Sequence, residues 1–331
     1  MKKIVFLCIA LGLRVASFSQ TNTNAVYNRF FTGSTMRVDY YHTGTAREEH
    51  FSMDRVLNDG PWAGSETVLL DNLNRGSYFF KVTDTLTHTL IYSRGFASIF
   101  GEWQSTGEPD WATFSESLRF PWPKVPVKVT IEKRDAKNNF VPVWSTVIDP
   151  ASRLVNPSVL KSSYKTFPYI ENGKSASHVD IVILGDGYTA AEMDKFHKDV
   201  KTLTDELFSV EPFKSRKADF NVRAVETPSA TSGVNKPHPG VFNRTPLSMS
   251  YGAFDSERYA LTFDNRTVRD VAASVPYDYM FILINERTYG GGGIFNLYST
   301  VAADNKFSRY IFVHEFGHSF AALADEYYTS D

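Results

Sequence analysis

Short runs of alternating apolar and polar residues fill the first half of the chain. Segments such as "GSYFFKVTD" (76–84) and "VKVTIEKRD" (127–135) are rich in β-branched and aromatic residues, a pattern typical of half-buried strands. Turn residues such as those of "LNDGPW" (57–62) separate the runs, and no long 3.6-residue period interrupts them. The pattern predicts an antiparallel β-sandwich over residues 20–150.

The pattern changes after residues 151–164, which have no periodicity and form the predicted linker. A continuous apolar run, Val179–Leu184, predicts a buried strand, and an amphipathic helical pattern follows it. Two later apolar runs, 220–226 and 277–285, predict further strands. Strands that alternate with helices are typical of an α/β layer, which we expect over 165–331. The predicted fold class is therefore α+β with two domains.

The start of the chain has a third pattern. Two lysines precede an apolar run, residues 4–13, and small residues follow it. This is the layout of a secretory signal peptide, which we predict over residues 1–19. The only cysteine, Cys8, lies inside it, so the mature chain would contain no disulfide. We therefore expect an exported protein, secreted or held in the periplasm or at the cell surface, that depends on its core for stability.

Composition excludes some classes of function. The apolar content of 42% and charged content of 22% are ordinary for a globular protein. A formal charge of −2 argues against a nucleic-acid-binding protein. No window has the apolar length that a membrane-spanning helix needs, so we expect no membrane span. The oligomeric state is left open.

The candidate chemistry lies in "HEFGHSFAALADEYY" (314–328), which begins with His-Glu-x-x-His. Residues four apart share one face of a helix, so His314 and His318 can bind one zinc ion. Glu315 can then act as the general base toward a zinc-activated water. Apolar residues surround the motif, and polar side chains in a buried helix need a specific role.

A third protein ligand is expected, and Asp325 and Glu326 are the candidates. Asp325 is the first choice, because a carboxylate oxygen is a good zinc ligand. Either residue could instead hold a histidine ring in place. In the metzincin pattern the third ligand lies ten residues after the first, which here is Ala324, and the preceding glycine corresponds to Ala321. The pattern is therefore shifted by at least one residue.

The chain resembles the IgA-specific zinc metalloendopeptidase family. The resemblance rests on residues 314–328 and on "VILGDGYTAAEMDKF" (182–196), and it extends over 165–331. It implies a metzincin-like zinc endopeptidase that acts on exported proteins, with the two histidines as ligands, Glu315 as base and an acidic residue of "ADEYY" completing the site. It also implies an N-terminal β domain, but not that immunoglobulin A is the substrate.

Metzincin-like sites have a methionine-containing turn after the third ligand, which forms the floor of the cleft. Only five residues follow Glu326 here, so we expect the peptidase domain to be incomplete at its C-terminus.

Other residues are weaker candidates. The glycine run 290–293 predicts either an edge strand that pairs with an extended substrate or a flexible loop. Tyr327 or Tyr328 would donate a hydrogen bond to an oxyanion or simply pack. Asp186 is a turn residue or a ligand of a second ion. Three tryptophans within 101–123 predict core packing or a carbohydrate platform. Six histidines show no ligand spacing and are expected at the surface or in packing: His42, His50, His88, His178, His197 and His238.

The sequence thus predicts a secreted zinc-dependent endopeptidase with a protein or peptide substrate. One alternative is a β-sandwich adhesin or glycan-binding protein with a truncated, inactive peptidase half. Another is a zinc hydrolase that acts on a different bond, such as an amide of the cell wall.

Overall fold

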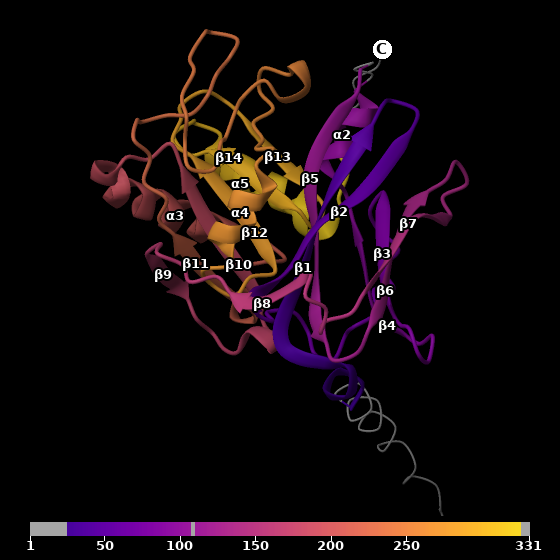
Figure 1. The fold of residues 1–331 in the computed structure, drawn as a ribbon. Coiled ribbons are helices and arrows are strands. Elements are labelled where there is room, and N and C mark those ends of the chain that lie inside the picture. Colours follow the sequence, from indigo (N-terminus) through magenta and orange to yellow (C-terminus); the bar gives the residue numbers. More distant parts are fainter. Residues whose placement is uncertain (1–24, 107–109, 326–331) are drawn as a thin grey trace, which may run out of the picture.

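The computed structural model describes residues 25–106 and 110–325. The predicted signal peptide, Glu326, Tyr327 and Tyr328 lie outside the described residues. The protein is a mixed α/β structure that consists mostly of sheets with few helices. Its two halves lie side by side, the first on the right and the second on the left of Figure 1. No helix among the described residues is long and apolar enough to cross a membrane.

Two four-stranded sheets build the first half. The first sheet has the order β5-β1-β2-β8, and the second has the order β4-β3-β6-β7. All neighbours are antiparallel except β2 and β8. The elements are β1 (Phe31–Gly44), β2 (Glu49–Pro61), β3 (Tyr78–Asp84), β4 (Leu90–Phe96), α2 (Ile99–Ser105), β5 (Ala112–Pro123), β6 (Val127–Arg134), β7 (Phe140–Ile148) and β8 (Val155–Val159).

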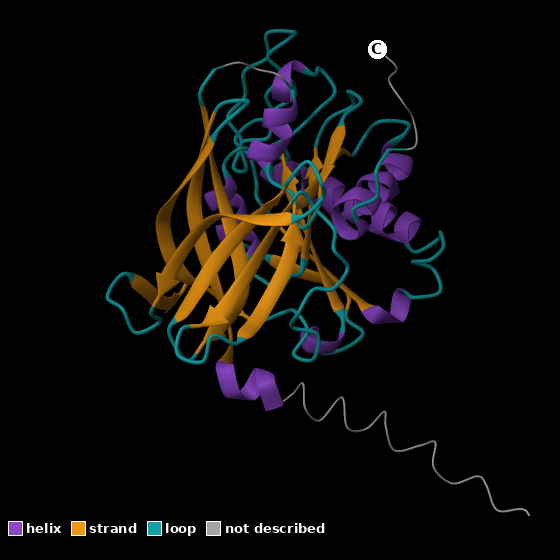
Figure 2. Cartoon of the chain, turned by 90° about the vertical axis from the view of Figure 1, so that its right-hand side faces the viewer, coloured by secondary structure: helices purple, strands orange, loops and turns teal. Residues whose placement is uncertain are grey.

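One hydrophobic cluster joins these two sheets. Val38 of β1 and Phe120 of β5 meet Phe80 of β3 and Val129 of β6 in it. Alternate residues of β6 are buried from Val127 to Ile131, because successive side chains of a strand point to opposite faces. The period-two pattern of the sequence therefore corresponds to strands with one face in this core, and the strands gather in one part of the molecule (Figure 2).

The predicted linker needs a correction, because part of it is a strand. Val155–Val159 forms β8 and pairs with β2 in parallel. Pro157 favoured a linker, since proline cannot donate to a strand ladder. However, β8 is an edge strand of its sheet, where a missing donor is tolerated.

A six-stranded sheet forms the centre of the second half. Its order is β13-β14-β12-β10-β11-β9; the four inner strands are parallel, and both edge strands are antiparallel to their neighbours. The elements are β9 (Thr166–Ile170), β10 (Val179–Asp186), α3 (Met193–Leu207), β11 (Phe220–Val225), α4 (Asn265–Ala272), β12 (Tyr279–Ile284), β13 (Gly291–Ile294), β14 (Tyr298–Ala302) and α5 (Ser308–Ala321).

The three strands expected from apolar runs are present as β10, β11 and β12, and the amphipathic pattern is present as α3. Thr189 and Glu192 form a capping box in the turn before α3. Asp186, at the end of β10, is fully buried and accepts hydrogen bonds from Thr245 Oγ1 at 2.5 Å and from the backbone of Leu247 and Met249. It therefore anchors a distant loop.

The two faces of the six-stranded sheet are covered differently. Ile181 and Ile183 of β10 face a core that α3 and α5 complete. Val182 and Leu184 face the other side, where α4 and α2 pack. Because α2 belongs to the first half of the chain, the first half covers part of the sheet of the second half.

A buried ionic network also joins the two halves. Arg37 of β1 has no exposed surface. Its guanidinium group lies 3.0 Å from Asp39, 2.7 Å from Asp59 and 2.5 Å from Asp270 of α4. Buried charges of this kind need partners, so Arg37 links the strand to the helix of the other half.

A second buried ionic cluster centres on His42 of β1. Its Nδ1 lies 3.1 Å from Glu116 Oε2, and its Nε2 lies 3.0 Å from Glu49 Oε2. The ring stacks between Phe51 and Phe100, with centroids 4.0 and 3.9 Å away. Burial alone would lower the pKa of His42, but the charges and hydrogen bonds of the two glutamates outweigh burial and raise it.

We predict that the free energy of unfolding falls as the pH rises above about 6.5, the usual pKa of histidine. When folding raises the pKa of a group, that group stabilises the folded state fully at pH values below its unfolded-state pKa. This stabilisation is lost as the pH rises through the folded-state pKa. Urea unfolding from about pH 5.5 to about pH 9 measures the slope, which is at most about 1.4 kcal/mol per pH unit for one proton.

His42→Gln should flatten this slope, whereas His50→Gln, in which the replaced side chain is 60% exposed, should leave it unchanged. The same slope in the parent protein and in His42→Gln would contradict the role of His42.

Candidate metal centre and cleft

Two histidines of α5 direct their ring nitrogens to one point. They lie four residues apart and share a helix face, and His314 Nε2 is 3.0 Å from His318 Nε2. His318 Nδ1 is 2.6 Å from the carbonyl oxygen of Leu323. This contact assigns the proton of His318 to Nδ1, so its Nε2 presents a lone pair to the point shared with His314.

Asp325 completes a three-residue cluster. Its Oδ1 lies 3.1 Å from His314 Nε2 and 3.2 Å from His318 Nε2. The three atoms form a nearly equilateral triangle. Tetrahedral ligands at the usual zinc distances lie about 3.3 Å from one another, so the residues fit such an ion. Of the two candidates for third ligand, the structure describes only Asp325.

The end of α5 explains the spacing of this cluster. Ala322 has a left-handed backbone with φ of 53°. Its amide donates to the carbonyl of His318, and the amide of Leu323 donates to that of Gly317. The chain then turns back, so Asp325 reaches the histidines. Ala321, which stands at the glycine position of the metzincin sequence pattern, is still helical here, and the turn comes at Ala322.

Glu315 follows His314 on α5 and is half-buried. Burial raises its pKa to about 8; the charge of Asp325 adds to this effect, and that of Arg258 opposes it. A cation held by the three neighbouring residues would favour the ionised carboxylate. Burial lowers the pKa of His314, and the charge of His318 adds to this effect. The neutral imidazole that a metal requires is therefore favoured.

Three of the four glycines, 291–293, lie in the edge strand β13 beside α5, so the flexible-loop alternative is wrong. A Cβ atom on Gly293 would lie 2.5 Å from the carbonyl oxygen of Glu315 and 3.0 Å from its Oε2. A Cβ atom on Gly291 would lie 2.9 Å from Ile311 Cγ2. Glycine is needed at both positions because the helix packs directly on the strand backbone.

A cleft of about 590 Å³ lies over the cluster. Its walls include β13, α5 and the loop residues Arg258 and Tyr259. Ala97 and Glu102 line it from the first half of the chain. Burial raises the pKa of Glu102, and the charge of His318 opposes this effect. Sequence reasoning missed Glu102 and Arg258, because neither lies in a motif and the chain brings them to the cleft only through long-range packing.

The remaining candidates lie elsewhere. None of the other six histidines lines this cleft. His197, for example, bonds Glu226 at 2.8 Å. Trp103 is buried in a core and Trp122 packs against another, while Trp111 is exposed. The tryptophans of 101–123 therefore form no shared platform.

We predict that Ala322→Gly stabilises the protein by about 1 kcal/mol, because glycine adopts the left-handed conformation without the strain of a Cβ atom. The free energy of unfolding in urea measures the effect. Ala321→Gly is the matched control, since a helical glycine should destabilise by about 0.5–1 kcal/mol. Equal effects of the two substitutions would contradict the special role of Ala322.

We predict that Gly293→Ala destabilises the protein by about 1–3 kcal/mol, because the added methyl group forces β13 away from α5. Gly33→Ala is the control: a Cβ atom there meets nothing within 4 Å. Chemical unfolding of both variants measures the difference. A Gly293→Ala protein as stable as the control would show that the helix and the strand are not in close contact.

Comparisons with known proteins identify the family of the chain. The family described as IgA Peptidase M64 matches residues 168–331. The family described as Peptidase M64 N-terminus matches residues 26–145. A comparison with curated proteins finds no match. The two family matches confirm the resemblance that the motifs indicated, and the chain belongs to the IgA peptidase M64 family, a family of peptidases.

Proposed function

We propose that the chain is a secreted zinc-dependent endopeptidase that cleaves extracellular proteins. The observation that supports it most is the convergence of His314, His318 and Asp325 within ligand distance of one another, beside a half-buried Glu315. Two ring nitrogens and one carboxylate oxygen leave a fourth tetrahedral position free, as in catalytic zinc sites.

Each residue has a role in this proposal. His314, His318 and Asp325 would hold the zinc ion, which when bound lowers the pKa of water toward neutrality and polarises a carbonyl group. Glu315 accepts a proton from the attacking water and passes it to the leaving amine. The carbonyl of Leu323 fixes the tautomer of His318. Glu326 stays an alternative ligand outside the described residues.

The cleft suits an extended peptide. β13 is an edge strand. The loop at Tyr259 already bridges its outer side at Gly291, so a substrate backbone can pair by strand addition with the part of this side around Gly293. We infer a metzincin-like arrangement, in which such a strand runs beside the zinc helix. The two facing sheets of the first half support our interpretation of it as a β-sandwich that docks or spaces the peptidase. The predicted signal peptide supports export.

Metal analysis with activity assays tests the proposal. We predict one zinc per chain in the protein from Gln20 to Asp331. Asp325→Ala should lose zinc and Glu326→Ala should keep it, because Asp325 already supplies the third protein ligand beside the two histidines. The reverse pattern would identify Glu326 as the ligand. A folded parent protein without zinc would reject the metal site.

Glu315→Gln should keep zinc but lower turnover by about 10²–10⁴-fold, the usual contribution of a general base. Asp205→Asn is a matched control, because this exposed carboxylate lies on α3, away from the cleft. Internal cleavage of a peptide library would support an endopeptidase. Cleavage of cell-wall amides alone would favour another zinc hydrolase, and a zinc-loaded protein without any hydrolysis would favour the binding-protein alternative.

A further inference from the structure

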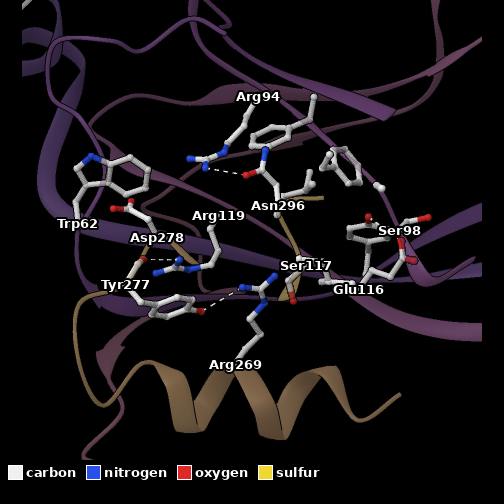
Figure 3. A pocket seen from close by; sticks show the side chains of 16 residues that line it. Trp62, Arg94, Ser98, Glu116, Ser117, Arg119, Arg269, Tyr277, Asp278 and Asn296 are labelled. Carbon is white, nitrogen blue, oxygen red and sulfur yellow. Dashed lines mark hydrogen bonds between the residues drawn. The ribbon is translucent and has the colours of Figure 1, made fainter. Parts of the chain in front are cut away.

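A small cavity lies where the two halves of the chain meet. Its lining comes from β4, β5 and Ala97–Ser98 on one side, and from α4, Asp278 and the turn at Asn296 on the other (Figure 3). Its volume is about 60 Å³, which is room for a few water molecules or one small ion. The cavity is distinct from the metal cleft, although Ala97 lines both.

Three arginines line this cavity: Arg94 from β4, Arg119 from β5 and Arg269 from α4. Arg119 is paired, because its Nε donates to Asp59 at 2.8 Å. Arg94 donates to neutral groups, at 2.9 Å to Asn296 Oδ1 and at 3.1 Å to a tyrosine hydroxyl.

Arg269 has the poorest set of partners. It is 5% exposed, and its one hydrogen bond to a described residue is a long one, 3.4 Å to the hydroxyl of Tyr277. Its Nε is buried without any hydrogen-bond partner. No carboxylate of the described residues lies within ion-pair distance of Arg269 or Arg94. In Figure 3, Arg269 extends from its helix into the space bounded by Tyr277 and Ser117.

The two carboxylates that line the cavity are engaged by other groups. Glu116 accepts from Tyr40 and His42 on Oε2 and from the backbone of Phe100 on Oε1. Asp278 accepts from the backbone amide of Asp180 at 3.0 Å. Neither carboxylate pairs with Arg269.

Most charged groups of this junction have an opposite charge beside them. Arg37, Arg55 and Arg119 contact the carboxylates of Asp39, Asp59 and Asp270, and His42 lies between Glu49 and Glu116. Arg94 lies in the field of Asp278. Arg269 has no corresponding anion. A buried charge without a counter-charge is costly, and a cavity beside it provides space for one.

We propose that this cavity binds a small monovalent anion, a halide or a short carboxylate, held between Arg269 and Arg94. The anion would neutralise Arg269, accept a hydrogen bond from its unpartnered Nε–H and connect α4 to β4. It would therefore act as a clamp between the two halves. The clamp and the metal cleft share Ala97, whose amide donates to the carbonyl of Phe295 at 3.0 Å.

Thermal unfolding tests the proposal without reference to peptidase activity. The parent protein is unfolded in sodium chloride and in sodium gluconate at equal ionic strength; gluconate is too large for the cavity. We expect a higher midpoint in chloride, by a few degrees, with an effect that saturates as chloride increases. Equal midpoints in the two salts would overturn the proposal.

Two variants locate the effect. Arg269→Met removes the unpaired charge, so its unfolding midpoint should be the same in the two salts. In gluconate, this midpoint should be equal to that of the parent protein or higher. Arg216→Met is the matched control, since this arginine is exposed at the surface, and it should keep the difference. A chloride effect that persists in Arg269→Met would place the ion elsewhere and reject the site.

Crystals of the parent protein grown in bromide give a test that needs no variant. An anomalous peak between Arg269 and Arg94, together with the saturating chloride effect, would support the proposal. Ordered water alone in the cavity would reject it. A bromide peak without a saturating chloride effect would mean binding at crystal concentration only, and would also reject it.

Discussion

The close contact between α5 and β13 is the constraint on which the candidate site depends. The helix backbone at Glu315 lies so near the strand that Gly293 has no room for a side chain. Ser299 of β14 fixes the same segment, because its hydroxyl donates to the carbonyl of Glu315 at 2.9 Å and lies 2.6 Å from the hydroxyl of Ser319. The helix therefore cannot rotate or slide without breaking buried hydrogen bonds.

Several properties of the site follow from this contact. Glu315 packs against the strand, which partly shields its carboxylate from water and raises its pKa. His314 and His318 then face the open side, where the cleft lies. An edge strand at contact distance from the general base also places any backbone that pairs with it close to Glu315. The glycines of β13 thus allow α5 to pack closely on the strand, and this packing determines the geometry of the cleft.

The local parts of this arrangement could be predicted from the sequence, and the long-range parts could not. Helical spacing alone places His314, Glu315 and His318, since the period of a helix is fixed by covalent geometry. The position of Asp325 depends on the left-handed backbone of Ala322, which sequence does not indicate because alanine seldom adopts it. Apolar periodicity predicted β10 and α3 for the same local reason, whereas β8 was hidden by Pro157. Glu102 and Arg269 carry no motif, and only folding brings them to a cavity or cleft.

The junction of the two halves has consequences for the cleft, because Ala97 and Glu102 are part of its wall. The first half is positioned by ion pairs such as that of the buried Arg37 with the half-buried Asp270, together with the packing of α2. Buried ion pairs add little net stability, since desolvation offsets their attraction, but a displaced partner leaves an unpaired charge at a cost of about 3–5 kcal/mol. These ion pairs therefore determine how the two halves are oriented, and they contribute little to the free energy of unfolding. A junction of this kind holds Glu102 at a fixed position relative to α5, and the two halves form the cleft together.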